Sequence, residues 1–161
     1  MKKQYLDKIA EAYYKLLLKI DWEDPIFMNG IREGLNKFLS NAYLKSYPTH
    51  KYLKGDFYST NAKKQIESGN VKGLIFEHMV PKSEYIQKPC EKIAEKKDEQ
   101  LTIDFIKDLL YKYWWIAIVT KEENALLMKN KMPSDWDQAN IHARYDAEKI
   151  ELIPVKNVLF P

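Results

Sequence analysis

The chain has 161 residues and a net charge of +3, and 45% of its residues are hydrophobic. Eleven Tyr, six Phe and four Trp supply bulky core side chains, which excludes an intrinsically disordered chain. The single cysteine, Cys90, excludes an internal disulfide framework and a cysteine-rich zinc site.

The N-terminal segment and the length of the apolar stretches indicate where in the cell the protein is expected. No apolar stretch reaches the roughly 18 residues that a membrane span requires. Lys8, Glu11 and Lys15 interrupt the apolar positions that follow the basic N-terminus, so we expect no secretory signal. Together with the single cysteine, this predicts a cytoplasmic protein without a membrane partner.

The first third of the chain reads as two helices. Apolar residues recur at helical spacing over 6–20, with Lys and Glu on the opposite face. Asp24 can cap a second helix that begins at Pro25, because proline suits the first helical position. A connecting stretch follows over 48–55, and Ser59-Thr60-Asn61 can cap a short helix that ends near 68–70.

The middle of the chain combines strands with further helices. The apolar run over 71–78 predicts a buried strand. Residues 82–97 are expected to be helical in two pieces, because Pro89 can start a helix but not continue one. A strong helical face occupies 102–113, and the aromatic and β-branched residues of 114–120 predict a second strand.

The last third is expected to contain two helices and a strand. Thr120 can cap a helix over 121–129, and acidic residues in its first turn suit the helix dipole. Ser134-Asp135-Trp136-Asp137 has the pattern of a capping box for a helix that runs to about Ala147. A last strand is predicted over 150–155. The result is a mostly helical α+β single domain, 1–161.

Lysines and aromatic residues alternate between Asn41 and Lys72. The stretch contains only two acidic residues, Asp56 and Glu67, but six lysines: Lys45, Lys51, Lys54, Lys63, Lys64 and Lys72. The interleaved aromatics are Tyr43, Tyr47, Tyr52, Phe57 and Tyr58. Lysines attract phosphates and aromatic rings stack on bases, so the stretch has the composition of a nucleic-acid surface. A solvated loop with its aromatic residues in the core explains the same composition.

The pair Glu77-His78 ends the first predicted strand. Hydrolysis of a phosphodiester needs a base that activates water and a cation that takes up charge on the leaving oxygen. A neutral imidazole can serve as the base, and hard divalent cations prefer oxygen ligands such as a carboxylate. Consecutive residues of a strand point to opposite sides, so the two side chains can act on opposite sides of one phosphate.

The sequence from Glu77 to Asn124 resembles the HNH (ββα-metal) endonucleases. Glu77-His78-Met79-Val80-Pro81 matches their acidic residue, histidine, two residues and proline. Thr120-Lys121-Glu122-Glu123-Asn124 has the spacing of their following helix, although Thr120 and Glu123 stand where zinc-binding cysteines usually occur. The resemblance implies a ββα-metal-like core over 71–130, which contains a helical insertion over 82–113. A helical part over 1–70 precedes this core, and a C-terminal helix and strand over 131–161 follow it.

The resemblance also implies roles for individual residues. His78 would be the general base, and Glu77 and Asn124 would bind a divalent metal ion, Mg or Mn, with Glu123 as the rival ligand. The family's middle Asn, which orients the base, falls near Trp115. Tryptophan cannot do this, so a backbone carbonyl or an Asn or Gln of the insertion would have to replace it.

The expected function is that of a metal-dependent endonuclease acting on DNA, of the kind found in restriction, phage defence or toxin systems. Lys63, Lys64, Lys82 and Arg144 are candidate nucleic-acid contacts, although Lys82 also suits an exposed helix start and Arg144 could brace the site. His50 and His142 are interpreted as bystanders. The alternative is a non-catalytic binding or immunity-type protein of a conflict system. The sequence leaves open a homodimer and a partner protein of a defence or toxin system.

Overall fold

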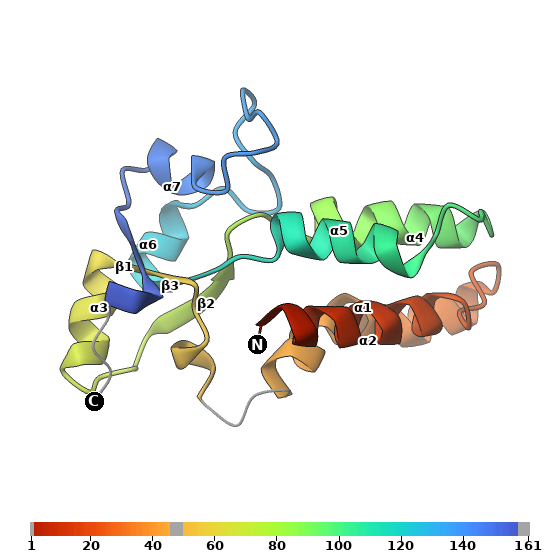
Figure 1. Ribbon diagram of the computed structural model, residues 1–161, viewed down its shortest axis with the longest axis horizontal. Coiled ribbons are helices and arrows are strands. Elements are labelled where there is room, and N and C mark those ends of the chain that lie inside the picture. The colour runs from red at the N-terminus through yellow and green to blue at the C-terminus, as the bar shows by residue number, and fades with distance from the viewer. Residues whose placement is uncertain (1, 46–49, 158–161) are drawn as a thin grey trace. The chain divides into compact units, whose positions relative to one another are not determined.

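The computed structural model describes residues 2–45 and 50–157 (Figure 1). The chain divides into two compact units, Met1–Pro48 with Lys82–Tyr113 (unit 1) and Thr49–Pro81 with Trp114–Pro161 (unit 2). The second segment of unit 1 has the bounds expected for the helical insertion, 82–113. The mostly helical α+β class is confirmed.

Unit 1 is helical, and its helices run side by side (Figure 1). They are α1 (Lys2–Leu17), α2 (Pro25–Lys45), the π-helical turn η2 (Ser83–Gln87), α4 (Lys88–Glu95) and α5 (Ile103–Tyr113). Their apolar faces form a core that includes Leu6, Ile9, Tyr13, Leu17, Leu39, Ile86, Cys90, Ile106 and Leu110. Cys90 is thus a core packing residue, like the apolar residues around it.

One local prediction for unit 1 is confirmed and another is wrong. Oδ1 of Asp24 accepts hydrogen bonds from the amides of Ile26 (2.8 Å) and Phe27 (3.1 Å), so it caps α2. Pro25 is the first residue of that helix. Pro89 was expected to divide the segment over 82–97, but the π-helical turn η2 passes without a break into α4, and Pro89 is the second residue of α4.

Unit 2 contains a mixed sheet with strand order β2-β3-β1-β4. Its strands are β1 (Phe57–Ser59), β2 (Leu74–His78), β3 (Ile116–Thr120) and β4 (Leu152–Pro154). Its helices are α3 (Thr60–Glu67), α6 (Lys121–Leu126) and α7 (Ala143–Ala147), with the short turns η1 (Lys51–Leu53) and η3 (Val155–Asn157). β2 pairs antiparallel with β3, which pairs parallel with β1, and β4 is antiparallel to β1.

One face of this sheet carries a hydrophobic cluster. Met79, Ala117, Val119, Leu127, Tyr145 and Ile150 form the cluster, and Phe57, Ile75, Trp115, Ile141 and Leu152 pack against it. Leu127 directly follows α6 and Tyr145 belongs to α7, so both segments cover the same face (Figure 1). β3 is buried along its whole length, which explains its continuous apolar sequence.

Two further expectations for secondary structure are wrong, and one strand was not expected. The helix predicted from Ser134 to Ala147 is limited to Ala143–Ala147, because Oδ1 of Asp137 accepts the amides of Ala139 and Asn140 (2.8 Å each) and forms a turn. The helix after Thr120 ends at Leu126 instead of Lys129. Between the connecting stretch over 48–55 and α3 lies β1, a strand that the sequence did not indicate.

Tyr47 and Pro48, which belong to the lysine and aromatic stretch and to the connecting stretch, lie outside the described residues. Among the described residues, no helix is both long and apolar enough to cross a membrane.

Candidate functional site

The Glu77-His78 pair ends β2, as the sequence predicted. Gly73, with a φ of 80°, turns the chain into the strand, and the antiparallel register pairs Glu77 with Ala117 and His78 with Ile116. Alternation along the strand places the Glu77 side chain on the face that α6 and α7 cover and the His78 side chain on the other face. The two candidate residues therefore lie on opposite sides of one strand end.

Glu77 is bound by Arg144 of α7. Arg144 Nη1 lies 2.9 Å from Glu77 Oε1, and the exposed fractions of the two side chains are 3% and 24%. Burial raises the pKa of Glu77 above its usual value, although the charge and hydrogen bond of Arg144 lower it. No hydrogen bond to Oε2 of Glu77 is found among the described residues, so one carboxylate oxygen is engaged and one is not.

His78 is held by its main chain and by an aromatic wall. Its carbonyl oxygen accepts a hydrogen bond from Arg144 Nη1 (3.0 Å). Its ring lies edge-on to the ring of Trp114, with a centroid distance of 4.6 Å, and 5.8 Å from that of Phe76. Trp115 packs instead with Phe57, at 6.2 Å, on the face that carries Glu77.

Tyr145 follows Arg144 on α7 and belongs to the hydrophobic cluster of the sheet. Its side chain is fully buried, and its hydroxyl has no hydrogen-bond partner among the described residues. Burial raises the pKa of Tyr145, and the negative charges of Glu77 and Glu123 raise it further, whereas the charge of Arg144 lowers it.

Glu123 serves as the capping residue that ties α6 to α3. Ser59 Oγ donates to its Oε2 (2.5 Å), Asn61 Nδ2 donates to its Oε1 (2.9 Å), and the amide of Thr120 also donates to Oε2 (2.9 Å). Thr120 Oγ1 accepts the Glu123 amide in return, which completes a capping box. Both carboxylate oxygens of Glu123 are thus engaged in structural hydrogen bonds.

Asn124 is the fourth residue of α6, and its side chain is partly buried. No hydrogen bond of its side chain is found within 2–45 and 50–157. Since Thr120 pairs with Leu74, α6 begins at the opposite end of β2 from His78. α6 itself packs against both β2 and β3.

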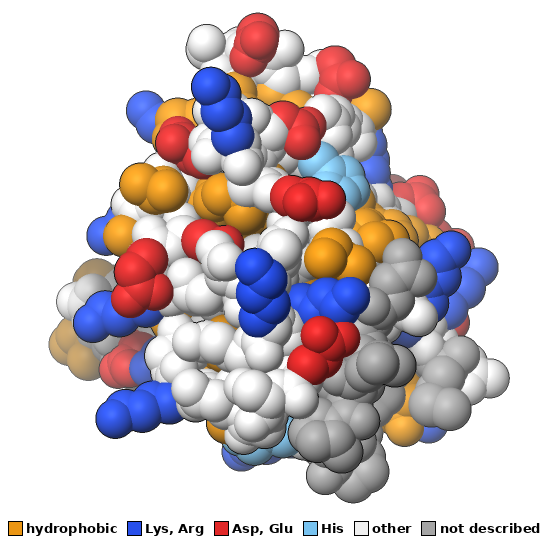
Figure 2. Space-filling model, turned by 90° about the vertical axis from the view of Figure 1, so that its left-hand side faces the viewer, with side chains coloured by type: hydrophobic (Ala, Val, Ile, Leu, Met, Phe, Trp, Pro, Cys, Tyr) orange, Lys and Arg blue, Asp and Glu red, His pale blue; other side chains and the backbone are white. Residues whose placement is uncertain are grey.

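The candidate nucleic-acid contacts differ in their surroundings. Lys82 Nζ donates to the carbonyl of Asn36 (2.6 Å) and to Gln87 Oε1 (2.8 Å), and burial lowers its pKa. Lys63 lies 3.7 Å from Glu67 on α3, next to the exposed Lys64, whereas the Arg144 side chain is buried against Glu77. The face drawn in Figure 2 likewise shows basic and acidic side chains interspersed instead of gathered by sign.

The fit of a divalent cation depends on Glu77. Within the part of the chain that the structure describes, no group of three or more His, Cys, Asp or Glu side chains could hold a metal ion. Mg²⁺, however, commonly binds through one or two carboxylates and keeps several waters, with substrate phosphates as further ligands. The partly exposed Glu77 carboxylate, with one engaged oxygen, fits that mode of binding.

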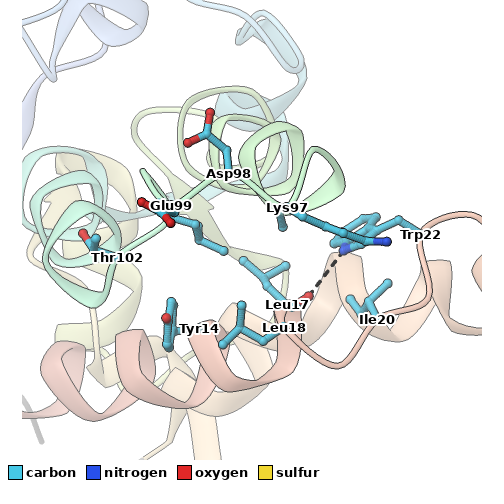
Figure 3. Close-up of a pocket in the computed structure, with 11 residues that line it drawn as sticks. Tyr14, Leu17, Leu18, Ile20, Trp22, Lys97, Asp98, Glu99 and Thr102 are labelled. Atoms are coloured by element: carbon cyan, nitrogen blue, oxygen red, sulfur yellow. Dashed lines mark hydrogen bonds between the residues drawn. The ribbon is translucent and has the colours of Figure 1, made fainter.

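Unit 1 has a separate hollow of about 450 Å³, shown in Figure 3. Leu17, Leu18 and Ile20 contribute its apolar part, and Trp22 borders it while its Nε1 donates to the carbonyl of Leu17 (3.3 Å). Lys97, which also lies 3.3 Å from Glu23, belongs to the rim. None of the predicted site residues lines this hollow.

Comparisons of the chain with models of protein families, with curated proteins and with solved structures find no match. The function therefore has to be inferred from the site itself. The sequence identified Glu77 and His78 as a motif and left two roles open for Arg144, a nucleic-acid contact or a brace of the site. Its bonds to Glu77 and to the His78 carbonyl are those of a brace.

Proposed function

We propose that the protein is a metal-dependent endonuclease that hydrolyses phosphodiester bonds of DNA. The observation that supports this most is the order strand, strand, helix in unit 2: β2 ends in Glu77-His78, pairs antiparallel with β3, and β3 leads directly into the capped helix α6. This is the arrangement that the resemblance to HNH endonucleases implies. The single buried cysteine also suits a cytoplasmic enzyme.

The proposed mechanism assigns proton transfer to His78. Its imidazole takes a proton from the attacking water, so that hydroxide adds to the scissile phosphorus and the 3′ oxygen leaves. Trp114 restricts the ring on one side, because the two rings are in edge-to-face contact. A bound Mg or Mn ion would supply charge stabilisation at the leaving oxygen. Glu77 would hold that ion, with Asn124 as the further predicted ligand.

Incubation of the purified full-length protein with supercoiled plasmid tests the proposal. We expect nicking with Mg²⁺ or Mn²⁺, none with EDTA, and at least about a hundredfold slower nicking by His78→Ala, because general-base catalysis contributes about 10²–10⁴-fold. His50→Ala is the matched control, since His50 precedes η1, where its Nδ1 accepts the Tyr52 amide at 3.4 Å and its ring contacts that of Tyr52. An intact plasmid with both cations, or equal nicking by His78→Ala, would refute the proposal.

A second candidate function is a binding protein of a conflict system, and one observation favours it. Large apolar side chains are exposed at the start of α2 and the end of α1, namely Ile26 (83%), Leu18 (58%) and Phe27 (39%). A groove of about 470 Å³ between the same helices is lined by Phe27, Ile31 and Phe38 among others. Exposed apolar patches mark interaction surfaces. A binding protein would leave the plasmid supercoiled in the experiment above.

A further inference from the structure

Arg144 contacts both residues of the motif at the end of β2. Its Nη1 lies 2.9 Å from Glu77 Oε1 and 3.0 Å from the carbonyl oxygen of His78. The side chain is 3% exposed, so these bonds form away from bulk water. A guanidinium presents several donors in a fixed plane, which lets one side chain hold a carboxylate and a carbonyl together.

The position of β2 explains why the His78 carbonyl needs this partner. β2 is an edge strand, and its ladder with β3 continues in the bond from the Met79 amide to the Trp115 carbonyl (2.9 Å). In an antiparallel ladder the intervening residue turns its main-chain groups away from the neighbouring strand. The His78 carbonyl therefore points off the edge of the sheet, where Arg144 binds it.

We propose that Arg144 is the positioning residue of the site, which takes over the role that the resembled family gives to a middle Asn. This inference rests on the proposed function. Arg144 binds the main-chain carbonyl of His78 and Trp114 contacts its ring, so the residue is held at its main chain and at its side chain. The Trp115 side chain, where the family's Asn would fall, packs on the other face of the sheet with Phe57 and the hydrophobic cluster.

The same contact has a second consequence at Glu77. Arg144 engages Oε1 and leaves Oε2 for a cation, but its own positive charge repels that cation. Replacing Arg144 by a neutral residue therefore has two opposite effects: the cation binds more tightly, and the His78 imidazole loses its fixed position. A general loss of stability would weaken both functions, so this combination distinguishes positioning from mere structural support.

The experiment compares the full-length wild type with Arg144→Gln and Arg144→Lys. Arg32→Gln is the matched control, because Arg32 is the other arginine and also pairs with a carboxylate, Glu91, at 2.7 Å. The first measurement follows the histidine ring resonances by nuclear magnetic resonance without DNA or metal. His78 is assigned by the resonance missing in His78→Ala. We expect the His78 resonance to shift and broaden in Arg144→Gln, with His50 unchanged and Arg32→Gln like the wild type.

Two further measurements complete the test. In a calorimetric titration with Mn²⁺, we expect Arg144→Gln to bind the cation about tenfold more tightly and Arg144→Lys to bind it as the wild type does. In the nicking assay, Arg144→Gln is expected to lower kcat about a hundredfold with little change in KM, because a misplaced base slows the chemical step. Arg144→Lys keeps the charge and regains part of kcat, and it also serves as the second variant if Arg144→Gln does not fold.

The outcomes separate this inference from the proposed function. An unchanged His78 resonance in both Arg144 variants overturns the positioning role, whatever the activity. Weaker Mn²⁺ binding by Arg144→Gln overturns it as well. If the wild type does not nick DNA, the proposed function fails, whereas the resonance measured without DNA or metal still decides whether Arg144 positions His78.

Discussion

Glu123 offers the sharpest separation of a structural role from a metal-binding role. Its carboxylate accepts three hydrogen bonds, from Ser59, Asn61 and the Thr120 amide, and these join the start of α6 to the start of α3. Glu123→Ala removes all three acceptors and the reciprocal half of the capping box. We therefore expect a loss of stability without a loss of cation binding.

The magnitude follows from the kinds of bond that are lost. Loss of a helix cap costs about 1 kcal/mol, and a hydrogen bond to a charged group contributes about 1.5–3 kcal/mol when it is buried. Asn61 is exposed and Ser59 is buried, so only the bond to Ser59 counts in full. The free energy of unfolding should fall by about 3 kcal/mol. Glu122→Ala, one position earlier and exposed, loses only its interactions with the N-terminus of α6 and should lower the free energy of unfolding by clearly less than Glu123→Ala does.

Urea unfolding followed by tryptophan fluorescence measures this difference, because Trp114, Trp115 and Trp136 all belong to unit 2. A lower midpoint with an unchanged slope indicates a change in stability alone. Mn²⁺ titration of the same variant should give the wild-type affinity. A variant of wild-type stability that no longer binds Mn²⁺ would show that Glu123 is a metal ligand and that its bonds to α3 contribute little.

Three further predictions concern a charge, a close contact and a partner. Burial raises the pKa of Glu77 in the folded state, so the folded protein binds this proton more tightly than the unfolded one. The free energy of unfolding therefore falls as pH rises from the ordinary carboxyl pKa of 4.5 through the folded value. In Glu77→Gln, urea unfolding at several pH values should show a smaller fall. Gly55→Ala should destabilise the protein by about 1–3 kcal/mol, because a Cβ would lie 2.7 Å from Ile118 Cγ1. Gly30→Ala in α2 meets no atom within 4 Å and should stabilise the protein by about 0.5–1 kcal/mol. Thermal unfolding distinguishes the two signs. DNA affinity, measured by fluorescence anisotropy, should fall steeply with salt, and a salt-insensitive complex would contradict backbone binding through lysines.

Local signals in the sequence were enough to predict the central part of unit 2. β-branched and aromatic residues mark β3, and the Thr120 to Glu123 spacing marks the capping box of α6, so both follow from short stretches of chain. β1 could not be found in this way. It has three residues, Phe57–Ser59, and it depends on a parallel partner strand about 60 residues further along the chain.

At the candidate site, too, contacts between residues far apart in the sequence could not be predicted. Glu77-His78 is visible as a motif, but its pairing with Arg144 spans 67 residues of sequence. The helix expected around Asp137 shows the converse error, since the capping pattern is satisfied by a local turn with Ala139 and Asn140. Side chains that can bond to nearby amides stabilise a turn as readily as a helix start, and the sequence pattern does not choose between them.

We predict that Asn124 shares a cation with Glu77. Glu77 pairs with Ala117, three residues before Thr120, which corresponds to about 10 Å along β3. Asn124, the fourth residue of α6, would have to bridge the distance to Glu77 together with one ion.

If this bridge forms, Asn124→Ala should weaken Mn²⁺ binding about tenfold, and Asn124→Asp should strengthen it, because a second carboxylate adds charge at an oxygen ligand. Glu122→Ala, on the exposed side of the same turn, should leave the affinity unchanged. Calorimetry on the full chain measures all three. Wild-type affinity in both Asn124 variants would assign the cation to Glu77, water and the substrate phosphate alone.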